Sequence, residues 1–218
     1  MKSVLLDFNG TLFFDSSFHK EAWAEIYREL NDGKEKGNLD SSVLGARNDD
    51  IIQKMAPELT PSERDWWSDH KESLYREMCK KHPEKLRLVA GAPELFRKLT
   101  DTKVPFILAS ASIRPNIDFY FETFGLEQWF DKEMVVYDDG TYENKGAMHI
   151  EAAKRLGVTL QECVVVEDSL HAISLAKELG AGLIIGIGSD SIHPELIRAG
   201  ATYCITDFTE FDMQWLRN

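Results

Sequence analysis

The sequence is short of cysteine and of long apolar runs. Its three cysteines, Cys79, Cys163 and Cys204, are odd in number and widely spaced. This pattern fits neither a zinc motif nor a disulfide framework, and it favours a reducing compartment. No apolar run is long enough to cross a bilayer, and Asp7 interrupts the amino-terminal run that a signal peptide needs. We therefore expect a cytoplasmic protein with no membrane partner.

Basic residues are also scarce. The 218 residues include 25 Lys and Arg against 37 Asp and Glu, which gives a net charge of −12. Such a charge argues against non-specific binding to nucleic acid, but a few local cations can still bind a small phosphorylated molecule. We expect a small phosphorylated substrate, no nucleic-acid partner, and a monomer of one large domain or one domain with an insertion.

A strand signal is missing throughout residues 14–83. Helices are predicted there at 18–30, 48–55 and 61–81, the last with a capping box that Thr60 and Glu63 form around Pro61. Elsewhere strands are predicted at 4–6, 104–109, 134–137, 163–166, 183–187 and 203–205, with helices between them. This alternation is typical of βαβ units in a parallel sheet. The sequence therefore predicts an α/β core, residues 1–15 and 82–218, interrupted by an all-helical cap, residues 16–81.

The first predicted strand ends in polar residues. Val4–Leu6 is a continuous apolar run, as expected for a strand buried on both faces. Asp7 and Asn9 then point the same way, because side chains alternate along a strand. Gly10 permits a sharp turn, and Thr11 places a hydroxyl beside the carboxylate. Open α/β sheets bind ligands at this end of their strands, although an ordinary Asp-Asn-Gly turn has the same residues.

Other predicted strands lead to polar residues at the same sheet edge. Ser110, Ala111 and Ser112 follow strand 104–109, Lys145 comes after strand 134–137, and Glu167 with Asp168 follows strand 163–166. Three acidic side chains make a hard oxygen site that suits Mg²⁺ with a substrate phosphate as co-ligand. Ser110, backbone N–H groups and Lys145 would surround a phosphoryl group, which leaves Asp7 to attack phosphorus and form an aspartyl-phosphate.

These segments resemble the motifs of the haloacid dehalogenase-like superfamily, and of its β-phosphoglucomutase-like branch in particular. The stretch from Asp7 to Thr11 matches Asp-x-Asp-x-Thr with one substitution. Ser110 matches the second motif, and Glu167–Asp168 matches the fourth. Lys145 matches the third, although Lys-Gly-Ala-Met replaces the usual Lys-Pro-x-Pro. The resemblance spans nearly the whole chain and implies a Rossmann-like core with a helical cap inserted after the first motif.

The resemblance also implies roles for individual residues. Asp7 would be the nucleophile. Asp7, Asp168 and the backbone carbonyl of Asn9 would hold Mg²⁺, with Glu167 contributing partly through water. The expected phosphate-binding residues are Thr11, Ser110, Ala111, Ser112 and Lys145. In the cap, His19, Arg47 and Lys71 resemble positions that face substrate. Their simpler interpretations are a helix-edge histidine, an arginine that stabilises a turn, and a lysine on a solvated helix face.

Asn9 departs from the family pattern. Family phosphatases and mutases have an Asp here that acts as general acid and base, and such catalysis contributes about 10²- to 10⁴-fold. Asn9 has no titratable proton, so it can position a leaving oxygen but cannot protonate it. Three explanations follow: either the substrate has a good leaving group, or another residue such as His19 supplies the proton, or the chain is a poor catalyst.

The favoured function is a Mg²⁺-dependent phosphatase acting on a small phosphorylated metabolite. A sugar phosphomutase is favoured by His19, Arg47 and Lys71 and disfavoured by Asn9. A metal-free dehalogenase tolerates Asn9 but gives Glu167 and Asp168 no purpose. A catalytically weakened phospho-ligand-binding protein is a further alternative.

Overall fold

The computed structural model describes residues 1–31 and 48–217. The chain forms two compact units, one made of Met1–Phe14 with Arg87–Asn218 and the other of Asp15–Leu86. Among the described residues, no helix is long and apolar enough to cross a membrane.

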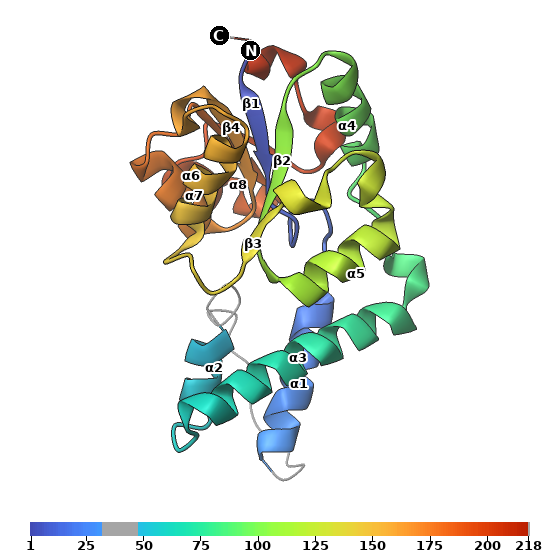
Figure 1. The fold of residues 1–218 in the computed structure, drawn as a ribbon, viewed down its shortest axis with the longest axis vertical. Coiled ribbons are helices and arrows are strands. Elements are labelled where there is room, and N and C mark those ends of the chain that lie inside the picture. Colours follow the sequence, from blue (N-terminus) through green and yellow to red (C-terminus); the bar gives the residue numbers. More distant parts are fainter. Residues whose placement is uncertain (32–47, 218) are drawn as a thin grey trace. The chain divides into compact units, whose positions relative to one another are not determined.

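The first unit is built on a six-stranded parallel sheet, counted over the described residues (Figure 1). Its strands are β1 (Ser3–Leu6), β2 (Phe106–Ile113), β3 (Val136–Asp138), β4 (Cys163–Glu167), β5 (Leu183–Ile187) and β6 (Tyr203–Ile205). Their order across the sheet is β3-β2-β1-β4-β5-β6. The chain direction across the sheet therefore reverses between β1 and β4, and open α/β sheets bind ligands at such a switch point.

The central strand explains the apolar run at the amino terminus. Leu5 pairs with Ile107 of β2 on one side and with Val165 of β4 on the other. All four residues of β1 are buried, because helices cover both faces of a parallel sheet. The helices of this unit are α4 (Ala92–Asp101), α5 (Arg114–Phe124), α6 (Lys145–Arg155), α7 (Leu170–Glu178) and α8 (His193–Ala199).

Two strand predictions need correction. Strand β2 begins at Phe106 and continues to Ile113, so Ser110–Ser112 lie within the strand rather than after it. The reason is that Ile113 still pairs with Asp138 of β3, beyond an irregularity in register. The strand predicted from residue 134 begins at Val136, because Lys132–Met134 forms a 3₁₀ turn.

The second unit contains only helices among its described residues. They are α1 (Ser16–Leu30), α2 (Asn48–Met55), α3 (Pro61–Lys81) and a short 3₁₀ helix, Pro83–Lys85. Thr60 and Glu63 form the predicted capping box at the start of α3. A small core of buried side chains joins α1 to α2: Trp23, Ile26, Ile51 and Ile52. The predicted fold class, an α/β core with an inserted helical cap, is confirmed.

Candidate active site

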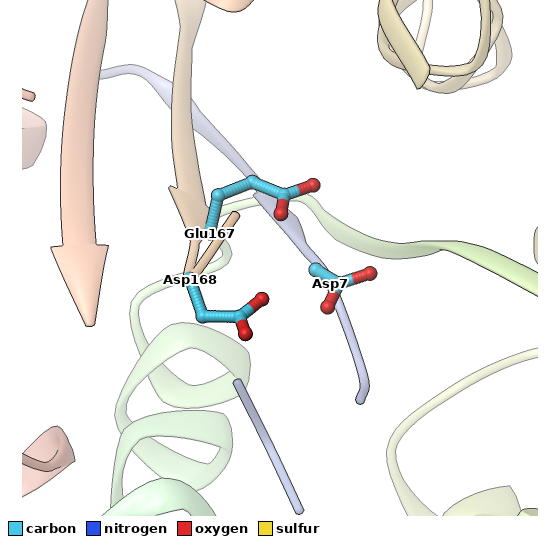
Figure 2. A group of neighbouring side chains, drawn as sticks. All are labelled: Asp7, Glu167 and Asp168. Atoms are coloured by element: carbon cyan, nitrogen blue, oxygen red, sulfur yellow. The ribbon is translucent and has the colours of Figure 1, made fainter. Parts of the chain in front are cut away.

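Three carboxylates meet at the switch point of the sheet. Asp7 follows β1, while Glu167 ends β4 and Asp168 comes directly after it. One oxygen from each of the three lies within 4.8 Å of the others, and Figure 2 shows the side chains converging. Asp7 and Glu167 are buried, with exposed fractions of 7% and 1%. Buried carboxylates this close together repel one another, so the cluster favours a bound cation.

Gly10 allows this close approach. Its backbone has a φ of +74°, and a Cβ built on it would stand 2.1 Å from Oδ2 of Asp168. Any side chain at this position would therefore strain the turn and displace the carboxylate. The glycine after Asn9 serves the geometry of the acidic cluster as well as the turn.

Lys145 supplies positive charge next to the carboxylates. It is the first residue of α6, and its Nζ donates to Oδ1 of Asp7 and to the carbonyl of Ala109, the latter at 2.7 Å. The same Nζ lies 3.2 Å from Oε1 of Glu167. Burial by itself would lower the pKa of Lys145, but the charges of Asp7 and Glu167 outweigh it and raise that pKa above its usual value.

Two opposed effects act on the pKa of Asp7. Burial raises the pKa of its carboxyl to about 7, while the charge of Lys145 acts in the opposite direction. Lys145 pairs with two of the three clustered carboxylates, Asp7 and Glu167, so its single charge does not balance the cluster when all three are ionised. A set of three carboxylate oxygens suits a hard divalent cation such as Mg²⁺, and such a cation would favour the ionised form of Asp7.

His149 also belongs to the site, although no sequence motif pointed to it. It lies one helical turn after Lys145 on α6, is buried, and places Nε2 3.1 Å from Oε1 of Glu167. The carboxylate can only accept, so Nε2 carries the proton. The spacing of four residues from Lys145 was the available signal, because residues i and i+4 share a helix face.

Asn9 is held in a closed ring of hydrogen bonds. Its Nδ2 donates to the hydroxyl of Tyr120 at 2.7 Å, and its Oδ1 accepts from Oγ of Ser112 at 2.6 Å. The two hydroxyls lie 3.3 Å apart. Since Ser112 spends its only proton on Asn9, Tyr120 is the donor between the hydroxyls. Tyr120 also stacks on Phe8, with ring centroids 4.1 Å apart.

The expected phosphate-binding residues have different surroundings. Ser110 is buried, donates to Oδ1 of Asn9 at 3.3 Å and accepts from the backbone N–H of Ser112. Ala111 is exposed. Thr11 is fully buried, and within the described part of the chain its hydroxyl has no hydrogen-bond partner. A buried hydroxyl without a partner is costly unless something else bonds to it.

His19 and Lys71 belong to a polar cluster in the second unit, in which Lys71 is buried and His19 is partly buried. Lys71 donates to Nδ1 of His19 at 2.9 Å and to Oε1 of Glu72 at 2.7 Å. Nε2 of His19 lies 3.2 Å from Oδ2 of Asp15, which also accepts from the hydroxyl of Tyr75. Lys71 is 2% exposed, so its side chain is not on a solvated helix face.

Glu72 is strongly held in its charged form. Burial by itself would raise its pKa, but the charge of Lys71 and hydrogen bonds from Asn48 and Lys71 outweigh burial and lower the pKa to about 2. The cluster is therefore a buried ionic network in which each charge has a partner. Arg47, the third cap residue singled out in the sequence, lies outside the described residues.

The sequence matches one family model and part of a known enzyme. A family model described as "Hydrolase: haloacid dehalogenase-like hydrolase" matches residues 1–180. A bifunctional riboflavin kinase/FMN phosphatase of Arabidopsis thaliana is 34% identical over 106 residues, which cover 46% of this chain and 27% of that protein. The chain thus spans about a quarter of that curated relative.

Solved structures resemble the chain over nearly its whole length. A HAD hydrolase of family IA, variant 3, from Entamoeba histolytica superposes with a TM-score of 0.91 at 31% identity, covering 99% of this chain and 97% of that one. A β-phosphoglucomutase from Clostridium difficile gives a TM-score of 0.80 at 16% identity, covering 99% and 95%. The second likeness shows the fold alone.

Proposed function

The chain belongs to the haloacid dehalogenase-like hydrolase family, and on that premise we propose that it is a Mg²⁺-dependent phosphatase acting on a small phosphorylated metabolite. The observation that carries the proposal is the position of Asp7. Its carboxylate contacts the ammonium of Lys145 and has an oxygen within 4.8 Å of two further carboxylates at the switch point of a parallel sheet. A hydrolase site with one nucleophilic carboxylate, one cation and a divalent-metal ligand set suits a phosphoryl group.

Asp7 is the proposed nucleophile. One of its oxygens bonds to phosphorus as the bond from phosphorus to the leaving oxygen breaks, which gives an aspartyl-phosphate. Water then attacks phosphorus, phosphate departs and the carboxylate is restored. Lys145 stays beside the reacting group and balances its negative charge, since its Nζ is fixed by the carbonyl of Ala109.

The metal ligands in this proposal are Asp7, Asp168 and the backbone carbonyl of Asn9, with Glu167 acting partly through water. When bound, Mg²⁺ neutralises charge on the phosphoryl oxygens. Ser110 gives up its long contact with Asn9 to donate to a phosphoryl oxygen. The backbone N–H groups of Ala111 and Ser112 and the hydroxyl of Thr11 are the remaining proposed donors.

The test is a phosphatase screen over acyl, aryl, sugar and nucleotide phosphates, with Mg²⁺ and with chelator. We expect Mg²⁺-dependent release of phosphate and its loss in Asp7→Asn. Asp101→Asn is the matched control, because it removes an exposed carboxylate at the end of α4. Acid quenching during turnover should trap a phosphorylated protein whose modified residue is Asp7. Full activity of Asp7→Asn, or activity independent of Mg²⁺, contradicts the proposal.

A further inference from the structure

The source of a proton for the leaving oxygen is the open question at this site. When the P–O bond of an alkyl phosphate breaks, its alcohol leaves as a strongly basic alkoxide unless a side chain protonates the oxygen, and such protonation contributes about 10²- to 10⁴-fold. Among the described residues, the sequence singles out two positions for this role: the residue two positions after the nucleophile, Asn9, and His19 in the helical unit. Each unit holds its candidate in hydrogen bonds that can be followed atom by atom.

The ring around Asn9 fixes an amide in place. Its amide nitrogen donates to Tyr120, Tyr120 donates to Ser112, and Ser112 donates to the amide oxygen, so each member of the ring donates one hydrogen bond to the next. An amide suits this ring of hydrogen bonds because it donates through its nitrogen and accepts through its oxygen. The ring therefore fixes the Asn9 side chain in place, and the amide does not release a proton to a leaving group.

His19 is engaged through both ring nitrogens. Its Nδ1 accepts from the ammonium of Lys71, which can only donate, so the ring proton is on Nε2. That nitrogen faces the carboxylate of Asp15 at 3.2 Å. One ring face also stacks on Tyr75, with centroids 4.1 Å apart and planes 7° apart. To serve as a general acid, His19 would have to release its proton from a buried carboxylate partner.

We infer that the substrate carries its phosphoryl group on an oxygen that leaves as a stable anion, as in an acyl phosphate or a phosphoanhydride. The inference rests on the phosphatase proposed above and specifies its substrate class. When Asp7 bonds to phosphorus, the electron pair of the broken P–O bond stays on the leaving oxygen, and a carboxylate or phosphate spreads that charge by resonance. In the second step water adds to phosphorus, the Asp7 carboxylate is released, and the proton of the water passes to phosphate and solvent.

The test measures kcat/KM against leaving-group acidity. A series of substituted phenyl phosphates keeps size and shape nearly constant, while acetyl phosphate, pyrophosphate and FMN sample a carboxylate, a phosphate and an alkoxide. We expect kcat/KM to fall by about 10²-fold or more from the most to the least acidic phenol, and FMN to be the poorest substrate. Acetyl phosphate and pyrophosphate separate the acyl and anhydride classes.

Two variants examine the two candidate acids. In His19→Gln, the dependence on leaving-group acidity should keep the slope of the natural chain, because His19 donates no proton. Asn9→Asp restores a carboxyl and should flatten the slope, raising turnover of FMN by about 10-fold or more. A flat dependence in the natural chain, or a His19→Gln loss confined to basic leaving groups, overturns the inference.

Failure of the inference and failure of the proposed function look different. If all substrates are hydrolysed at similar rates and Asp7→Asn is inactive, the phosphatase stands and the substrate class is wrong. If no phosphate ester or anhydride is hydrolysed, or Asp7→Asn hydrolyses them as fast, the phosphatase itself is wrong.

Discussion

Nε2 of His149 lies 3.1 Å from Oε1 of Glu167, and both residues are 1% exposed. Lys145 approaches the same oxygen, Oε1, from the same helix. Two donors therefore fix one oxygen of Glu167, which sets the direction of the other. Groups that orient a metal-binding carboxylate typically affect metal affinity by about 10- to 100-fold.

This contact gives a prediction for His149→Met. The thioether fills similar space but has no N–H, so Glu167 loses one of the two donors that orient it. Mg²⁺ affinity, measured by calorimetry, should fall by about 10-fold. His149→Gln keeps an N–H that can reach Glu167 and should lose less. Equal affinity of the two variants, with unchanged melting temperatures, would show that His149 only fills space.

Gly10 provides a second prediction, with a control in the same unit. Gly140 has a φ of +81°, close to the +74° of Gly10, but a Cβ at Gly140 would meet nothing within 4 Å. Gly140→Ala should cost about 1–2 kcal/mol through backbone strain alone. Gly10→Ala adds a collision with Asp168, so it should destabilise the fold further and weaken Mg²⁺ binding. Similar Mg²⁺ affinity in the two variants contradicts the collision.

The sheet and the edge that carries the site were predictable from short-range patterns. Val4–Leu6 and Cys163–Val166 are apolar over their whole length, which is typical of strands in a sheet covered on both faces. Strand ends gather at one edge in any parallel sheet, so the meeting of Asp7 with Asp168 follows from topology. The roles of these residues stay predictions.

Contacts set by distant partners could not be predicted. The partner of Asn9 is Tyr120, 111 positions away, and nothing local to either residue indicates which way the amide turns. Glu167 contacts His149 of α6. The direction in which His149 points depends on how α6 is rotated when it packs against the sheet. The local pattern of Ser110–Ser112 indicates the end of a strand. Strand β2 nevertheless continues past Ala109, because it pairs with β3.

Tyr120→Phe tests the ring without disturbing the aromatic packing. The phenyl ring keeps the stacking on Phe8, while the amide nitrogen of Asn9 loses its acceptor. One hydrogen bond typically contributes about 0.5–1.5 kcal/mol, so the free energy of urea-induced unfolding should fall by that amount. Tyr142→Phe is the control, because the hydroxyl of Tyr142 makes a long contact, 3.5 Å, with Arg155. Equal losses in the two variants would contradict the ring.

The buried network around Glu72 should make the stability of the fold depend on pH. The carboxyl has a folded-state pKa of about 2 against an ordinary value of 4.5. A lowered folded-state pKa stabilises the protein fully above pH 4.5, and this stabilisation is lost as pH falls from about 4.5 towards 2. The difference corresponds to about 3 kcal/mol. The free energy of unfolding should therefore decline over this window, and part of the decline should disappear in Glu72→Gln.

The quantity to compare between variants is the slope of the free energy of unfolding against pH, not its absolute value. Glu72→Gln leaves the buried ammonium of Lys71 without its carboxylate, so the variant is less stable at neutral pH whatever happens in acid. Glu77 lies on the same helix and is exposed, so Glu77→Gln is the matched control and should keep the slope of the natural chain. If Glu72→Gln keeps that slope as well, the network does not hold Glu72 in its charged form, and the tight pairing of Lys71 with Glu72 is wrong.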